Sequence, residues 1–438
     1  MNAAYMIVAK IQEAGHEAVF AGGCVRDMIM KQPPHDYDIA TSAKPDEVEA
    51  LFENTIPIGK QFGVVTVVMN GNSYEVATFR ADGFSTDNRR PDSIEFCSIE
   101  EDAKRRDLTI NGMFYDPVAK KLHDFVGGQH DIQQRMVKFI GDPASRIKED
   151  HLRMLRAIRF ASRFNYSMEF YSALAIHNNA SKIASVSIER IRDELIKMVL
   201  HSNRANALNH LEQIGILEHV LPEVHAMAGC EQNAKWHPEG DVFNHTVAAL
   251  KCLDDTVGVV ETWATLLHDV GKPVISTEED GVIRAITHDT VGAKMAETIL
   301  RRLKFPNDEI EKIVGIVKDH MKIKHCVEFR NSTLNKYMIS GYFDELMKVS
   351  LADSKSGAND VEWHSILQDR IKTFKVRHVT DALNTVSPLV NGDDLIAIGY
   401  TQGKALGAML KTLHQMQLDN EIHSKEDGCR YAKNILTQ

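Results

Sequence analysis

Over the first 140 residues, short apolar runs alternate with polar turns, and this pattern predicts a small mixed α/β domain. Strands are predicted over 18–21, 37–41, 62–70 and 73–80, and helices over 25–31 and 45–52. The last two strands are joined by Asn70-Gly71, a dipeptide typical of tight β-hairpin turns. The beginning of the chain is therefore expected to form a compact palm built on a sheet.

Beyond residue 140 the strand pattern is lost and apolar positions recur at helical spacing. At 438 residues the chain is too long for one ordinary core, so several domains are expected. We predict an α+β chain with a mixed α/β palm followed by three all-α domains. The predicted ranges are 1–140 for the palm, 141–228 for a helical neck, 229–370 for a histidine-bearing domain and 371–438 for a tail.

The composition favours a soluble globular protein, with 43% hydrophobic and 26% charged residues and no membrane-length apolar run. Charged residues close to the N-terminus argue against a secretory signal. Six cysteines without a C-x-x-C pair fit reduced thiols in a cytoplasm. The formal net charge of −10 argues against indiscriminate binding of polyanions, although it allows a local basic groove.

The first candidate chemistry lies at the start of the palm, where the Gly22-Gly23 turn precedes Asp36 and Asp38. Residues two apart in an extended segment face the same side, so both aspartates can hold one pair of divalent ions. The glycine turn allows backbone amides to approach a triphosphate. Glu75, on the predicted hairpin, could stand beside them as a third carboxylate. This set suits metal-assisted phosphoryl or nucleotidyl transfer.

Cations follow in two places. Arg106 suits triphosphate oxygens, and Asp107 beside it could accept a hydrogen bond from a ribose hydroxyl. The window 146–163 then holds six Lys or Arg residues against two acids. Its arginines are spaced by three, three and four residues, which places them on one helical face; they are Arg153, Arg156, Arg159 and Arg163. Asp150, one turn before Arg153, completes a donor–acceptor pair able to read a base edge.

Together these motifs resemble, in order, the motif set of class II tRNA nucleotidyltransferases, which are the CCA-adding enzymes and their poly(A) polymerase relatives. The motifs are GG-x-VRD at 22–27, D-x-D at 36–38, RRD at 105–107, DFVGG at 124–128, ED-x-x-R at 149–153 and ERIRDEL at 189–195. The resemblance covers nearly the first half of the chain. It implies a nucleotidyltransferase palm, with tRNA, CTP and ATP as partners.

The resemblance also implies residue roles. Asp36 and Asp38 would hold two Mg²⁺ ions, and Asp150 with Arg153 would select CTP and then ATP without a nucleic-acid template. The implied nucleotide-binding residues are Gly23, Arg26, Arg106, Asp107, Asp150, Arg153, Arg156 and Arg159.

Two segments favour the CCA-adding branch of this family. Residues 58–68 resemble the CCA-type strand, and residues 80–93 resemble the flexible loop that the final A addition requires. An enzyme that adds only A can keep that loop, so an A-adding enzyme or a poly(A) polymerase stays open. A further alternative is a phosphohydrolase whose first domain only binds RNA. The intact carboxylate and arginine set argues against it.

A second candidate site lies in the histidine-bearing domain, where the order H…HD…D resembles the HD phosphohydrolase superfamily. Imidazole and carboxylate ligands suit divalent metals such as Ni²⁺, Mn²⁺ or Mg²⁺, and a metal-bound hydroxide can attack a phosphoester. The expected ligands are His245, His268, Asp269 and Asp353, with His288 and His320 for a second metal. The arrangement is similar to CCA-adding enzymes with a fused HD domain, which implies phosphatase and 2′,3′-cyclic phosphodiesterase activity used in RNA repair.

Overall fold

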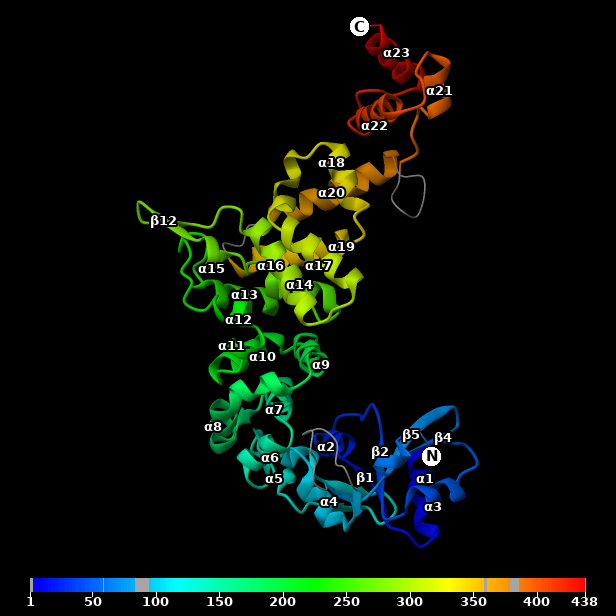
Figure 1. Ribbon diagram of the computed structural model, residues 1–438, viewed down its shortest axis with the longest axis vertical. Helices are drawn as coiled ribbons and strands as arrows, with labels where there is room; N and C mark the ends of the chain where they lie inside the picture. Colours follow the sequence, from blue (N-terminus) through cyan, green and yellow to red (C-terminus); the bar gives the residue numbers. More distant parts are fainter. Residues whose placement is uncertain (1–2, 58, 83–93, 358–360, 379–385, 438) are drawn as a thin grey trace. The chain divides into compact units, whose positions relative to one another are not determined.

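The chain folds into two compact units, Met1–His225 and Ala226–Gln438 (Figure 1). The computed structural model describes residues 3–57, 59–82, 94–357, 361–378 and 386–437. Most of the loop at 80–93, expected to serve the final A addition, lies outside the described residues. The division at 225/226 lies close to the predicted end of the neck at 228, and the finer division into four domains stays a prediction.

A seven-stranded mixed sheet forms the base of the first unit, in the order β3-β4-β5-β2-β1-β8-β9. Strands β2 and β5 run parallel, whereas the other neighbours in this sheet are antiparallel. The strands are β1 Ala18–Ala21, β2 Asp38–Thr41, β3 Thr55–Ile56, β4 Val64–Met69, β5 Asn72–Thr78, β8 Phe114–Asp116 and β9 Lys121–His123. The predicted mixed α/β palm and its four predicted strands are confirmed: β1 has the predicted ends, and the ends of β2, β4 and β5 differ by at most two residues.

The predicted hairpin between β4 and β5 has the expected turn. Asn70 and Gly71 have φ values of 54° and 76°, and Met69 pairs with Asn72. Positive φ at both turn positions matches the right-handed twist of the strands. The turn therefore sets the register that places Glu75 opposite Thr66.

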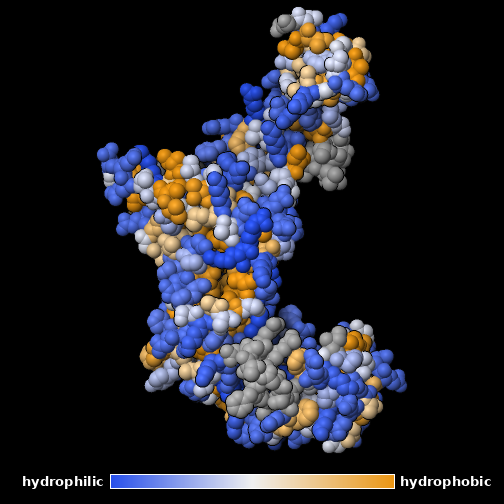
Figure 2. Space-filling view, in the orientation of Figure 1, coloured by the Kyte–Doolittle hydropathy of each residue, from blue (hydrophilic) through white to orange (hydrophobic). Residues whose placement is uncertain are grey.

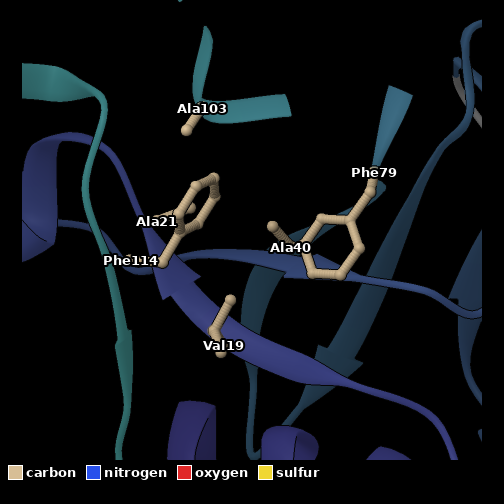
Figure 3. Packing of buried hydrophobic residues seen from close by; sticks show 6 residues of the cluster. All are labelled: Val19, Ala21, Ala40, Phe79, Ala103 and Phe114. Atoms are coloured by element: carbon tan, nitrogen blue, oxygen red, sulfur yellow. The ribbon is translucent and has the colours of Figure 1, made fainter. Parts of the chain in front are cut away.

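Helices cover the sheet on both faces. α1 (Ala3–Glu13) packs on β1 and β2, and α3 (Pro45–Leu51) packs on β4 and β5. On the opposite face, Val19, Ala21 and Phe114 pack beneath Ala103 of α4 (Ile99–Arg105), as Figure 3 shows. Burial of these apolar side chains fixes the ends of β1 and β2, where the candidate carboxylates lie.

The rest of the first unit is helical apart from two small strand pairs. β10 (Met136–Val137), at the end of the predicted palm, runs parallel to β11 (Ser167–Met168), which lies inside the predicted all-α neck. β6 (Arg80–Asp82) pairs with β7 (Ile94–Phe96). The α-helices are α2 Gly23–Ile29, α5 Gly128–Gln133, α6 Pro143–Glu149, α7 Arg153–Phe164, α8 Phe170–Asn179, α9 Ile188–Val199, α10 Arg204–Gln213, α11 Leu217–Val220 and α12 Pro222–His225. Short 3₁₀ helices are η1 Lys60–Phe62, η2 Thr109–Asn111 and η3 Ala180–Ser185.

The described residues of the second unit are helical apart from one β-hairpin. β12 (Thr277–Glu279) and β13 (Val282–Arg284) are joined by Asp280-Gly281, both at positive φ, so this dipeptide forms a turn that the all-α prediction overlooked. The helices are α13 Val242–Cys252, α14 Val259–Leu267, α15 Lys272–Ile275, α16 His288–Arg302, α17 Asn307–Asp319, η4 Lys322–Glu328, α18 Asn331–Met338, α19 Phe343–Ser356, α20 Glu362–His378, α21 Gly392–Ala397, α22 Lys404–Leu418 and α23 Lys425–Leu436. Within the described ranges, each helix is too short or too polar to cross a membrane.

Candidate functional site

Asp36 and Glu75 lie near enough to Asp38, at the start of β2, for their charges to act on it, but the three carboxylates are not among the groups of metal-ligand spacing in the described residues. Ile39 of β2 pairs with Val76 of β5 in parallel register. Asp38 and Glu75, one residue earlier in each strand, therefore lie on adjacent strands. Partial loss of hydration raises the pKa of Asp38, and the negative charges of Glu75 and Asp36 raise it further. This mutual repulsion is what a divalent cation would relieve, and carboxylate oxygens are the ligands that Mg²⁺ prefers.

Arg106 lies between this carboxylate cluster and the glycine turn. Its guanidinium is held by Asp102, with Nη2 3.0 Å from Oδ2, and its charge opposes the rise in the pKa of Asp38. Gly22 has a φ of 69°, and a Cβ there would lie 3.1 Å from Arg106 Nη1. The turn into α2, which begins at Gly23, therefore requires glycine beside a cation suited to phosphate oxygens.

Arg26 lies in the interior, with 4% of its surface exposed. Its guanidinium donates to Asp27 Oδ1 and Asn111 Oδ1, each at 2.7 Å, and lies 4.8 Å from the ring centroid of Phe164. The structure thus gives Arg26 a role in joining α2 to α7, while its implied triphosphate contact stays a prediction.

The arginine face of α7 is half-buried against partners from other segments. Arg156 Nε donates to Asp107 Oδ2 at 2.7 Å, and Arg159 Nε donates to Glu194 Oε2 at 2.6 Å. Burial alone would raise the pKa of Asp107, but the charge and hydrogen bond of Arg156 hold it below its ordinary value. The ribose-binding candidate is therefore ionised and fixed in orientation.

The predicted base-reading pair is brought to one place, but its members have different partners. Asp150 is bound by Arg190 of α9, at 2.7 Å from Nη2 to Oδ2 and 3.3 Å from Nη1 to Oδ1. Arg153 Nη1 donates to Glu149 and to the carbonyl oxygen of Arg146. Asp150 is thus oriented by Arg190 and Arg153 by Glu149. Their joint role in base selection stays a prediction.

The histidines and aspartates of the H…HD…D pattern meet in one buried cluster of the second unit. His245 Nε2 lies 3.1 Å from Asp353 Oδ1 and 3.2 Å from His268 Nε2. On the other side of Asp269, Oδ1 is 3.3 Å from His288 Nε2 and 4.0 Å from His320 Nε2. We call these six residues the His/Asp cluster: His245, His268, Asp269, His288, His320 and Asp353.

The cluster contains two groups of metal-ligand spacing that share Asp269. Asp269 Oδ2 lies 3.3 Å from His268 Nε2 and 3.6 Å from His245 Nε2, so the two oxygens of one carboxylate face different histidine pairs. The geometry therefore fits two cations bridged by a carboxylate.

Each cluster histidine is oriented through its other ring nitrogen. Nδ1 of His268, His288 and His320 lies 2.7–2.8 Å from the carbonyl oxygen of the residue three positions earlier. Nδ1 of His245 lies 2.5 Å from Glu239 Oε1. In the described part of the chain, Nε2 of His288 and of His320 has no hydrogen-bond partner although both are buried. Such orphaned nitrogens, fixed toward a carboxylate, are suited to ligate a metal.

Charges in and around the cluster keep its carboxylates ionised. Burial alone would raise the pKa of Asp269 and of Asp353, but neighbouring cations, among them Lys272 and Lys324, hold both well below the ordinary value. Burial lowers the pKa of His320 to about 3, so this imidazole is neutral. Anionic carboxylates and a neutral imidazole are the forms that bind metals. His245 differs, because burial alone would lower its pKa but hydrogen bonds to Asp353 and Glu239 outweigh burial and raise the pKa to about 9, so a metal there would displace a proton.

The chain is similar to known proteins over most of its length. Three family models match the chain: the poly A polymerase head domain over 18–138, the probable RNA and SrmB-binding site of polymerase A over 165–227, and the tRNA nucleotidyltransferase domain 2 over 276–428. None of these descriptions names the His/Asp cluster, and the third match begins after Asp269.

Curated relatives decide the family. The CCA-adding enzyme of Geobacillus stearothermophilus is 30% identical over 423 residues, which span 96% of this chain and 93% of that protein. The CCA-adding enzyme of Bacillus velezensis is 36% identical over 312 residues, 71% of this chain and 70% of the relative. The chain belongs to the CCA-adding enzymes. These are the class II tRNA nucleotidyltransferases that the palm and neck motifs resemble.

Solved CCA-adding enzymes share the fold along the whole chain. The Bacillus stearothermophilus CCA-adding enzyme, solved in complex with CTP, is 27% identical and covers 99% of this chain with a TM-score of 0.76; 97% of that structure is matched. The Thermotoga maritima enzyme complexed with tRNA is 17% identical with a TM-score of 0.64, at 99% coverage of this chain and 95% of its own, and shows likeness of fold.

Sequence reasoning missed three residues that orient candidate groups. Arg190 lies within the ERIRDEL motif, so a signal was present, but its partner Asp150 is 40 residues away. Glu239 and Lys324 contact His245 and Asp353 from a loop and a 3₁₀ helix, where no periodic pattern marks them.

Proposed function

We propose that this chain adds CCA to the 3′ end of tRNA, with CTP and ATP as substrates. The observation that carries the proposal is the carboxylate cluster of Asp38, Glu75 and Asp36 beside Arg106. The similarity to the CCA-adding enzyme solved with CTP supports the same substrate. The RNA 3′-hydroxyl attacks the α-phosphorus of the nucleotide, and pyrophosphate leaves.

In this reaction the palm residues provide ligands for Mg²⁺ and contacts to the triphosphate. Asp36 and Asp38 hold Mg²⁺, with Glu75 as a third carboxylate beside them. Bound Mg²⁺ would stabilise the negative charge that develops on the phosphoryl oxygens and the leaving pyrophosphate. Gly23, at the glycine turn, lets the backbone approach the triphosphate, and Arg106 faces its oxygens.

The neck residues select the nucleotide. Asp107, ionised by its pairing with Arg156, accepts from a ribose hydroxyl. Asp150 and Arg153 present an acceptor and a donor one turn apart, which is what the Watson–Crick edge of cytosine or adenine requires. Because Arg190 and Glu149 already orient these two groups, base recognition needs little reordering.

Incorporation of single nucleotides tests this function. The purified chain is incubated with tRNA that lacks CCA and with each radiolabelled nucleotide in turn. Two C residues and then one A are expected, with no incorporation of G or U. If the chain added no C to tRNA lacking CCA but did add A to tRNA ending in CC, it would be an A-adding enzyme. Long A tracts would indicate a poly(A) polymerase.

The second unit supports an additional phosphohydrolase activity of the HD type. The supporting observation is the pair of ligand groups bridged by Asp269, with Nε2 of His288 and His320 aimed at it and lacking hydrogen-bond partners among the described residues. A divalent metal held there would supply an activated hydroxide for attack on a phosphoester. Phosphatase and 2′,3′-cyclic phosphodiesterase reactions would both serve the repair of RNA ends.

Phosphatase assays on wild type and His268→Ala, with Ni²⁺, Mn²⁺ or Mg²⁺, test this activity. Hydrolysis is expected in the wild type and is expected to disappear in the variant. Equal rates in both proteins would contradict a phosphohydrolase activity at the His/Asp cluster. The assay is run without tRNA and CTP, so that the palm contributes nothing to the signal.

A further inference from the structure

A cavity of about 720 Å³ extends from the His/Asp cluster to the surface of the second unit. His245, Asp269, His288 and Asp353 line it, together with a set of apolar and aromatic side chains. A volume of this size is typical of small-ligand sites and matches one nucleotide better than a bare phosphate ion. The cavity therefore has room beyond what a phosphoryl group needs at the cluster.

Trp236 is an unusual part of the cavity wall because it is 56% exposed. The two other tryptophans of the chain, Trp263 and Trp363, are 0% and 5% exposed. Lys235 Nζ lies 5.0 Å from the centroid of the Trp236 ring. An indole that is left out of the core and lines a cavity offers a flat apolar face to a ligand.

More apolar surface surrounds this indole. Val282 of β13 and Met321 line the same cavity, and each is 37% exposed. Figure 2 shows apolar side chains gathered on the surface near α15, beside the polar tip of the β12–β13 hairpin. Exposed apolar groups around a polar, histidine-rich cavity favour a ligand that is part aromatic and part charged.

The charged part is met by cations. Lys272 Nζ lies 2.6 Å from Asp269 Oδ2, and Lys324 Nζ lies 2.6 Å from Asp353 Oδ2. Both lysines line the cavity, as does Arg284. The two lysines thus stand beside the carboxylates of the cluster, where their ammonium groups can also reach the oxygens of a phosphate group.

We propose that the cavity binds one nucleotide unit, with its phosphoester at the His/Asp cluster and its base stacked on Trp236. This inference rests on the proposed phosphohydrolase function and adds to that site a residue that binds the base, Trp236. In the reaction, water adds to phosphorus and the bond between phosphorus and the ribose oxygen breaks. The ribose oxygen leaves with a proton from that water.

Hydrolysis of two matched phosphomonoesters tests the role of the base. Adenosine 2′-monophosphate and glycerol 2-phosphate are both esters of secondary alcohols, but only the first carries a base. With Mn²⁺ or Ni²⁺, kcat/KM is expected to favour the nucleotide, and Trp236→Ala is expected to reduce kcat/KM for the nucleotide roughly 5- to 150-fold. The rate on glycerol 2-phosphate should stay unchanged, and Trp236→Phe should retain most of the preference. An equal effect of Trp236→Ala on both esters would overturn the proposal.

Tryptophan fluorescence provides a readout that does not depend on hydrolysis. All three tryptophans belong to the second unit, so nucleotide binding to the palm does not affect this signal directly. Adenosine 2′-monophosphate is expected to quench the wild type, and Trp236→Ala should lose most of this change. Quenching without hydrolysis in the wild type would support the nucleotide site and overturn the phosphohydrolase function. Quenching that persists in Trp236→Ala would overturn the stacking role.

Discussion

Arg190 of α9 binds the carboxylate of Asp150 through both terminal nitrogens, at 2.7 and 3.3 Å. A bidentate guanidinium holds a carboxylate in one orientation, which a single hydrogen bond does not. Asp150 therefore presents a fixed acceptor next to Arg153 at the site proposed to select the base.

Arg190→Ala is expected to weaken base selection. Without its partner the Asp150 carboxylate can rotate, so the ratio of kcat/KM for CTP over UTP should fall about tenfold, equivalent to ~1.4 kcal/mol. Arg190→Lys keeps the positive charge but cannot form the bidentate contact, so its CTP/UTP ratio should lie between those of the wild type and Arg190→Ala. Single-nucleotide incorporation measures the ratio. A uniform loss for all nucleotides would contradict a positioning role.

The two proposed chemistries should separate by mutation. Asp38→Ala is expected to reduce CTP incorporation by roughly 10³-fold or more, because it removes a cation ligand at the reacting phosphate. The same variant should keep the phosphatase rate of the wild type. His268→Ala should do the reverse. Circular dichroism of both variants checks that the fold is retained, and loss of both activities in either variant would count against two separate sites.

The His/Asp cluster is expected to bind two cations. Because Asp269 bridges two histidine pairs, His320→Ala should bind one Ni²⁺ or Mn²⁺ fewer than the wild type in calorimetric titration. His325→Ala is the matched control, since His325 lines the same cavity but belongs to neither ligand group. Identical stoichiometry in wild type and His320→Ala would rule out the second metal position.

The buried ion pair between Arg159 and Glu194 is expected to matter for stability, since the two side chains are only 12% and 4% exposed. Glu194→Ala leaves a buried guanidinium without its partner and should lower the free energy of unfolding by about 3–5 kcal/mol. The neighbouring Asp193→Ala removes a carboxylate that is 53% exposed and should cost under ~1 kcal/mol.

Urea unfolding followed by circular dichroism measures this difference. Tryptophan fluorescence serves as an internal control, because all three tryptophans lie in the second unit and should report an unchanged transition. If Glu194→Ala and Asp193→Ala unfolded at the same urea concentration, the buried ion pair would contribute no more to the free energy of unfolding than an exposed carboxylate.

Asp107 should make the stability of the first unit depend on acid. Its pKa is lower in the folded chain than its ordinary value of 3.8, so its pairing with Arg156 stabilises the fold fully above about pH 5. As pH falls below that value, the unfolded state takes up the proton first, and the stabilisation is lost. The free energy of unfolding should therefore fall more steeply between pH 5 and 3 in the wild type than in Asp107→Asn. Parallel slopes would exclude this linkage.

Much of the palm could be predicted from local patterns. The Asn70-Gly71 turn and the strand-forming runs of β4 and β5 in the palm, like the apolar stripe of α7 in the neck, each depend on residues close together in sequence. The candidate metal ligands of the palm could also be predicted locally, because Asp36 and Asp38 are only two residues apart in the sequence. The overlooked hairpin at Asp280-Gly281 was local too, and its strands were missed because they are only three residues long.

The partners of the candidate groups could not be predicted in the same way. Asp107 meets Arg156 across 49 residues, and His245 meets Asp353 across 108. By itself the sequence determined which residues carry charge, ligand atoms and turn conformations. Only the tertiary structure decided which of them meet, because packing of α13 against α19, and of α7 against α9, brings distant side chains into hydrogen-bond range.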